Sequence, residues 1–270
     1  MNGFVLRVIA MLTMLTDHIG WNFLERPMML TWIGRVAFPL YAVLLADGFH
    51  CIHTDQDRLS RHLSTMLILA VVSEFGYDLM DERLVFSHYL DSQSNLITLL
   101  CGYVGMLATE TLAPSTQSGG KCASGTRLVP LLCAYGLLGF ANYMAHGNFN
   151  LVGPWLVIAL YWYLRASRKA EAAGAAWSWG KRFLILVSGF AVYLVLYFWV
   201  RSGFGPPPRL WKEVVDFAPW IVGHLIAAFL ISRYNGTLGY HGKWFRRLYT
   251  SFYPAHMYVI GIICILMGKQ

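Results

Sequence analysis

Long apolar runs, each close to the length of a membrane-spanning helix, recur along the whole sequence. A helix needs about 20 consecutive apolar residues to cross the hydrocarbon core of a bilayer, within a range of roughly 17–25. Reading such windows predicts about nine spans, at residues 4–24, 29–51, 63–80, 96–112, 128–145, 151–164, 183–200, 217–232 and 248–267. The pattern therefore predicts an all-α fold, a polytopic transmembrane helix bundle, in a single domain that covers residues 1–270.

Composition and charge support this prediction. Charged residues make up 13% of the chain, against about 25% in soluble domains. With an N-terminus inside, the cytoplasmic loops hold about 13 Lys and Arg residues against about 6 outside, so the positive-inside rule predicts a cytoplasmic N-terminus. The same rule accounts for the net charge of +7, and nucleic-acid binding is not expected. The five cysteines are scattered without metal-site spacing, which predicts free thiols and no metal site.

The first span contains an arginine and a histidine on the same helical face. Arg7 and His18 are eleven residues apart, about three helical turns, which places them roughly 16 Å apart along one side of the helix. Ionisable side chains at membrane depth usually face a bundle interior or a water-filled cavity. The pair predicts a polar channel with a cation near one mouth and a titratable imidazole deeper inside, and it favours chemistry or transport over a scaffold.

Other polar residues within the spans admit structural and functional interpretations. Asp17 and His18 are adjacent, so their side chains point about 100° apart and do not form a dyad; Asp17 is free to pair with Arg35. A carboxylate from another helix is a better partner for the imidazole. An ion pair between Arg35 and Glu74 would simply hold the bundle together. Further polar residues in or next to the spans are Asp47, Asp78, Asn95, His224 and His256.

Five sequence blocks resemble the TraX family of membrane acetyltransferases, which is named for a conjugative-pilin N-acetyltransferase. The blocks follow the family order over nearly the whole chain: MLTMLTDHIG, IGRVAFPLYAVLLADGF, SEFGYD, NLITLLCGYVG and YNGTLGY…SFYPAHM. The spacing of Arg7 and His18 is also similar to the first-helix motif of type 3 membrane acyltransferases. The resemblance implies acetyl transfer from cytoplasmic acetyl-CoA, across a bacterial inner membrane, to an amine or hydroxyl at or beyond the far side. It leaves open whether the acceptor is a peptide N-terminus, a glycan or a lipid.

Together with this resemblance, the polar residues suggest a mechanism. His18 is expected to act as the general base, because imidazole titrates near neutral pH, and Glu74, with Asp47 behind it, is expected to orient it. Arginine suits a CoA phosphate, although positive-inside topology alone also explains the loop arginines. The expected catalytic residues are His18, Glu74, Asp17 and Asn95, the last as a donor to the thioester carbonyl. The expected donor-binding residues are Arg7, Arg35, Arg165, Arg168 and Arg246, and the expected acceptor-pocket residues are Asp47, Asp78 and His256.

Two other functions fit the same residues. A proton-coupled transporter or flippase would use His18, Asp17 and Glu74 as a proton relay, and it would move substrate without any dependence on CoA. A non-catalytic assembly factor for surface appendages would tolerate the loss of His18 as long as the fold survived.

Overall fold

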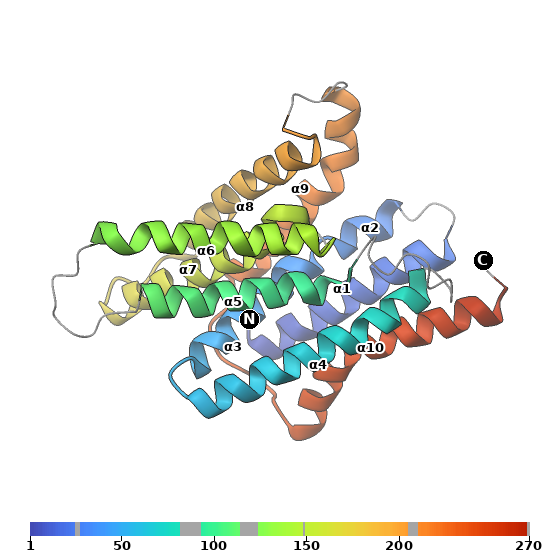
Figure 1. Ribbon diagram of the computed structural model, residues 1–270, viewed down its shortest axis with the longest axis horizontal. Coiled ribbons are helices and arrows are strands. Elements are labelled where there is room, and N and C mark those ends of the chain that lie inside the picture. Colours follow the sequence, from blue (N-terminus) through green and yellow to red (C-terminus); the bar gives the residue numbers. More distant parts are fainter. Residues whose placement is uncertain (25–27, 82–92, 114–123, 148, 205–209, 269–270) are drawn as a thin grey trace.

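The computed structural model describes residues 1–24, 28–81, 93–113, 124–147, 149–204 and 210–268, and within these ranges the chain forms helices joined by short loops, without a strand (Figure 1). This confirms the expected all-α fold. The helices in chain order are α1 (Gly3–Phe23), α2 (Met28–Gly34), α3 (Ala37–Ile52), α4 (Gln56–Asp81), α5 (Asn95–Leu112), α6 (Ser124–Met144), the short 3₁₀ helix η2 (Asn150–Val152), α7 (Gly153–Ala172), α8 (Trp179–Arg201), α9 (Leu210–Ser232) and α10 (Lys243–Leu266).

Each expected span overlaps one helix, except 29–51, which is divided between α2 and α3, and 151–164, which begins in η2 and continues in α7. In the described part of the chain, six helical stretches are long and apolar enough to cross a membrane, so the expected count of about nine is not confirmed. These stretches are Gly3–Phe23, Trp32–Ile52, Gln56–Met80, Asn95–Leu112, Trp179–Arg201 and Lys243–Leu266.

The second expected span is interrupted where its arginine lies. Helix α2 ends at Gly34, a turn follows at Arg35 and Val36, and α3 begins at Ala37. Pro39 lies in the first turn of α3, where its missing N–H removes no helical hydrogen bond and its fixed φ suits a helix start. The interruption places Arg35 at a joint between two helices rather than in the middle of a continuous one.

Helices α1, α4 and α10 lie together along one side of the molecule (Figure 1). Helices α1 and α10 run in the same direction, because Phe4 contacts Phe245 near their starts, with ring centroids 4.7 Å apart, and His18 contacts His256 further along. Helix α4 packs tightly on α10 at Gly261, where an added Cβ would lie 2.8 Å from the carbonyl oxygen of Leu79. The starts of α1 and α10 therefore lie at the same end of the bundle.

Helices α3, α5 and α7 form a second closely packed group. A Cβ at Gly102 of α5 would lie 2.5 Å from Val157 of α7, so the absence of a side chain permits this approach. Phe49 of α3 is fully buried and meets Tyr103 of α5 and Tyr161 of α7 edge to face, at ring-centroid distances of 5.2 and 5.4 Å. These aromatic contacts fix the spacing of the three helices.

Candidate functional site

Two cavities lie next to each other inside the bundle. The larger has a volume of about 440 Å³ and is mostly apolar, and the smaller has a volume of about 40 Å³. Tyr41, Leu99 and Tyr253 line both cavities and form the wall between them. The larger volume is typical of a small-molecule site, whereas the smaller has room only for a few atoms or waters.

His18 lines the smaller cavity, and its ring is oriented by His256. The two imidazoles stack with their ring centroids 4.9 Å apart, and His18 Nδ1 lies 2.8 Å from His256 Nε2. His256 Nδ1 lies 2.7 Å from the carbonyl oxygen of Phe252, so it must carry the proton that it donates there. His256 Nε2 is then an acceptor, His18 Nδ1 is the donor, and the lone pair of His18 is on Nε2.

This contact corrects the expected partner of His18. Glu74 does not orient the imidazole; its carboxylate accepts hydrogen bonds from Ser94, from the backbone N–H at 3.1 Å and from Oγ at 2.5 Å. Glu74 therefore stabilises the start of α5, where Ser94 is the N-cap residue. His256 was expected in the acceptor pocket, and it lies behind His18 instead.

Asp17 and Arg35 both line the smaller cavity beside His18. Two of their atoms, Asp17 Oδ1 and Arg35 Nε, are buried without a hydrogen-bond partner. The guanidinium of Arg35 lies over the ring of Trp220, 4.3 Å from its centroid, which is a cation–π geometry. Glycines make room for both side chains, because a Cβ at Gly34 would lie 2.2 Å from Asp17 and a Cβ at Gly223 would lie 2.5 Å from Arg35.

Asn95, the first residue of α5, also lines the smaller cavity. Its backbone N–H donates to the phenol oxygen of Tyr253 at 3.0 Å, and its side-chain Oδ1 is buried without a partner. His18, Asp17, Arg35 and Asn95 therefore line one small cavity. Glu74, which was expected beside His18, does not line it, and Arg35, which was expected at the donor, does not line the larger cavity.

Basic residues line the larger cavity near the start of α10. Arg7 lies over the ring of Tyr249, 5.5 Å from its centroid, and Arg246 and His241 line the same cavity. The structure thus places two of the expected donor-binding arginines, Arg7 and Arg246, at the cavity that adjoins the His18 site.

Asp47 and Arg168 bind each other instead of lining either cavity. Arg168 of α7 donates to Asp47 Oδ1, and Tyr234 donates to Asp47 Oδ2 at 2.8 Å. Burial, and then the Asp47 carboxylate, raise the pKa of Tyr234, which keeps its phenol protonated as a donor. The expected roles of Asp47 in the acceptor pocket and of Arg168 at the donor are therefore replaced by an ion pair that joins α3 to α7.

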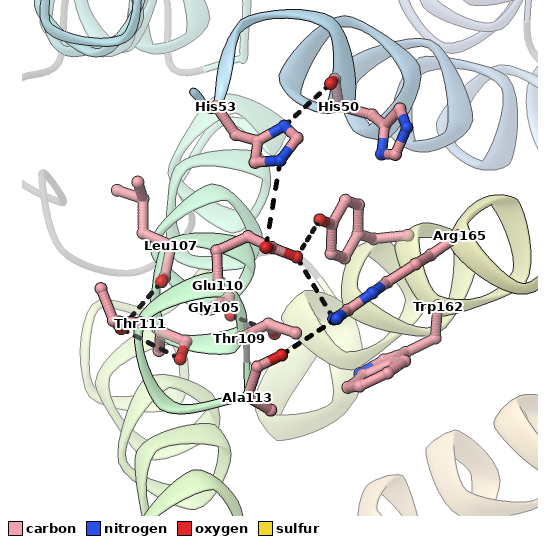
Figure 2. A network of polar contacts seen from close by, with 12 residues as sticks. His50, His53, Gly105, Leu107, Thr109, Glu110, Thr111, Ala113, Trp162 and Arg165 are labelled. Carbon is pink, nitrogen blue, oxygen red and sulfur yellow. Dashed lines mark hydrogen bonds and ion pairs between the residues drawn. The ribbon is translucent and has the colours of Figure 1, made fainter. Parts of the chain in front are cut away.

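Arg165 belongs to a similar network around Glu110, which Figure 2 shows. Arg165 Nη1 lies 3.2 Å from Glu110 Oε1, and Arg165 Nη2 donates to the carbonyl oxygen of Ala113 at 3.0 Å. Tyr161 donates to the same carboxylate oxygen at 2.5 Å, and His53 Nε2 lies 4.0 Å from Oε2. The sequence prediction missed Glu110 as the partner that occupies Arg165.

Asp78, the last of the expected pocket residues, is buried on α4 and lines neither cavity. Conversely, the sequence prediction missed Tyr41, Ser94 and Tyr253. A signal for Tyr253 exists, because it precedes His256 by three residues in SFYPAHM and the two therefore share a helical face. Their rings are in contact, edge to face, with centroids 5.9 Å apart.

Comparison with known proteins gives one result. The family described as TraX protein matches residues 2–264, nearly the whole chain. No curated protein and no solved structure matches it. A match of this extent shows the relationship directly, and the chain belongs to the TraX family.

Proposed function

We propose that the protein is an integral membrane acyltransferase that moves an acetyl group from cytoplasmic acetyl-CoA to an amine or hydroxyl acceptor on the far side of the membrane. The observation that carries the proposal is the pair of adjoining cavities, with His18 lining the smaller one and the lone pair of its imidazole on Nε2. Membership of the TraX family, which is named for pilin acetylation, supports the same chemistry.

The larger cavity suits the donor. Its apolar lining and volume of about 440 Å³ fit the extended arm of an acyl thioester, and Arg7 and Arg246 supply cations for the phosphates at the end where α1 and α10 begin. The positive-inside rule assigns that end to the cytoplasm. The thioester then reaches the wall formed by Tyr41, Leu99 and Tyr253.

The smaller cavity suits the reacting end of the acceptor. Its volume of about 40 Å³ admits an amino or hydroxyl group but little more. As the acceptor attacks the carbonyl carbon, His18 Nε2 takes its proton, the new C–N or C–O bond forms and the C–S bond breaks. His18 then returns the proton to the sulfur of CoA. Asn95 and Arg35, which line the smaller cavity, are the groups proposed to stabilise charge on the thioester oxygen once the acetyl group enters it.

The experiment is acetyl-CoA turnover by the purified protein in proteoliposomes, with CoA release measured in the presence of primary amines, glycans and lipid acceptors. Release that depends on an acceptor and is abolished in a folded His18→Ala variant is the expected result. Acceptor movement across the bilayer without CoA release would favour the transporter alternative and overturn the proposal.

A further inference from the structure

Leu99 is the one aliphatic side chain in the wall that separates the two cavities. It lies on α5, one helical turn after Asn95, and is 5% exposed. The other two wall residues are fixed by contacts elsewhere. The phenol oxygen of Tyr253 accepts the backbone N–H of Asn95 at 3.0 Å, and the ring of Tyr41 stacks on that of Tyr249 with centroids 5.9 Å apart. The size of the Leu99 side chain therefore determines how much space this part of the wall takes.

The smaller cavity has room for very few atoms. Its volume is about 40 Å³, and a single water molecule needs about 10–15 Å³ of such space, so about three or four atoms fit. An acetyl group has three non-hydrogen atoms, and the attacking nitrogen or oxygen of the acceptor is a fourth. The cavity is therefore full once an acetyl group and the attacking atom are both inside it, and a longer acyl chain does not fit.

The other apolar residues of the smaller cavity are packed too closely to make more space. Met14, Ala37 and Phe38 are between 4% and 6% exposed, and Phe38 stacks on Phe149 with ring centroids 4.0 Å apart. An extra methylene forced into such packing displaces its neighbours. Behind Leu99, by contrast, lies the larger cavity of about 440 Å³. Space that is vacated at Leu99 would therefore open the smaller cavity towards a volume that already exists.

The position of Leu99 relative to Asn95 places it beside the acyl chain. Residues four apart share a face of a helix, and a helical side chain leans towards the N-terminus of its helix, which for Leu99 is the turn that holds Asn95. Both residues line the smaller cavity. An acyl group whose oxygen is held at Asn95 therefore brings the carbons of its chain against Leu99.

Resting on the proposed function, we propose that Leu99 sets the length of the acyl group that the protein transfers, because it keeps chains longer than acetyl out of the smaller cavity. In the transfer step the acceptor nitrogen or oxygen bonds to the carbonyl carbon, the C–S bond breaks, and His18 carries the proton of the acceptor to the sulfur of CoA. These bond changes are the same for acetyl, propionyl and butyryl thioesters. Leu99 therefore acts on the choice of donor and takes no part in the chemistry.

The test is a competition between three donors in one sample. Purified protein in proteoliposomes receives equal concentrations of acetyl-, propionyl- and butyryl-CoA, with benzylamine or benzyl alcohol as the acceptor, and mass spectrometry measures the acylated products early in the reaction. For competing donors the product ratio equals the ratio of their kcat/KM values. Because all three donors meet the same protein molecules, this ratio does not depend on the fraction of the protein that is folded.

Two substitutions shorten the Leu99 side chain in steps. Leu99→Val removes one carbon atom, which matches the one extra carbon of propionyl, and Leu99→Ala removes three, which exceeds the two extra carbons of butyryl. Leu96→Ala is the matched control for the product ratios. It makes the same change on the same helix, at a residue that is 8% exposed and lines the larger cavity but not the smaller one.

We expect the unmutated protein to prefer acetyl to propionyl by about tenfold or more, since one methylene in an apolar pocket changes selectivity by about 10–200-fold. Leu99→Val should raise the propionyl-to-acetyl ratio by about tenfold, and Leu99→Ala should raise the butyryl-to-acetyl ratio by about as much or more. Leu96→Ala should leave both ratios unchanged. Leu99→Val, the milder change, keeps the test valid if Leu99→Ala does not fold.

Unchanged product ratios in the folded Leu99 variants would overturn the inference and leave the acyltransferase proposal intact, and so would equal transfer of all three acyl groups by the unmutated protein. The same shift in Leu96→Ala as in Leu99→Ala would also overturn it, since the larger cavity as a whole, rather than the wall, would then set the chain length. Failure of the unmutated protein to transfer any acyl group to either acceptor would count against the proposed function itself, and the inference would fall with it.

Discussion

Two groups of polar residues lie inside the bundle, and they differ in how their carboxylates are paired. Between α3 and α7, each oxygen of Asp47 has a partner, Arg168 on one side and Tyr234 on the other. Glu110 likewise binds an arginine and a tyrosine (Figure 2). Around the smaller cavity, by contrast, Asp17 Oδ1 is buried without a hydrogen-bond partner.

The difference separates carboxylates that pair within the protein from a carboxylate oxygen that does not, and under the proposed function a bound reactant supplies that missing partner. A buried polar atom without a partner costs about 1–3 kcal/mol. The first group avoids most of this cost for its carboxylates by pairing within the protein, and so it stabilises the contact between α3, α5 and α7. The second group leaves Asp17, Arg35 and Asn95 with unpaired atoms at one cavity, where a bound reactant can supply the missing partners.

The largest effect on transfer is expected at His18. Because a general base typically contributes about 10²–10⁴-fold to the rate, His18→Ala should reduce acetyl transfer by that factor and leave the protein folded and able to bind acetyl-CoA. Thr16→Ala, which changes a residue two positions away on α1 that lines neither cavity, is the control and should keep its activity. CoA release measures both variants. Full activity in a folded His18→Ala protein would show that the smaller cavity is not the catalytic site.

A smaller loss is expected at His256, which positions the imidazole of His18. Its Nε2 fixes the proton of His18 on Nδ1, so His256→Ala should lower the rate, but by less than His18→Ala does. His256→Gln should recover part of the loss, because its amide oxygen can accept the same hydrogen bond. Equal rates for the Ala and Gln variants, measured by CoA release from folded protein, would mean that this hydrogen bond has no catalytic role.

A still smaller change is expected at Arg7, and it concerns donor binding rather than the chemical step. A hydrogen bond to a charged group contributes about 1.5–3 kcal/mol, so Arg7→Ala should weaken acetyl-CoA binding by about tenfold or more and reduce the rise in melting temperature that acetyl-CoA produces. The melting temperature of the free protein should hardly move. Undiminished stabilisation by acetyl-CoA in this variant would place the donor somewhere other than the larger cavity.

Substitutions in the first group of polar residues, around Asp47 and Glu110, should lower the stability of the protein and leave the rate of the catalytic step almost unchanged. Asp47→Asn weakens the pair with Arg168, and its expected cost in the free energy of unfolding is about 1–3 kcal/mol. Turnover per folded molecule should remain close to that of the unmutated protein, since Asp47 lines neither cavity. A denaturation curve and a CoA-release assay on the same sample measure both quantities. A large loss of turnover at unchanged stability would mean that Asp47 takes part in catalysis, and that the two groups do not differ in function.

The helices were predictable from the sequence because each apolar run reports local structure. Helical spacing alone also predicted a shared face of α1 for Arg7 and His18, which line adjoining cavities. The sequence could not reveal the contact between His18 and His256, which are 238 positions apart. Nothing local distinguishes that partner from Glu74, whose carboxylate is instead used at the start of α5.

The arginines predicted to lie in cytoplasmic loops also have partners that the sequence does not reveal. Arg165 and Arg168 looked available for a nucleotide because the sequence shows their charge but not their neighbours. Glu110 and Asp47, which bind them, come from helices far away in the chain. The wall residue Tyr41 was missed for a different reason: an aromatic residue in an apolar run has the same pattern whether it fills a core or borders a cavity.

The wall of Tyr41, Leu99 and Tyr253 has a consequence for the energy balance of a cell. A membrane that maintains an electrochemical gradient loses stored energy through any continuous aqueous pore. In the proposed reaction only the acetyl group needs to pass this wall, and the CoA remains on one side. Under this proposal, the three side chains of the wall act as electrical insulation, and a chemical group is exported while the voltage across the membrane is preserved.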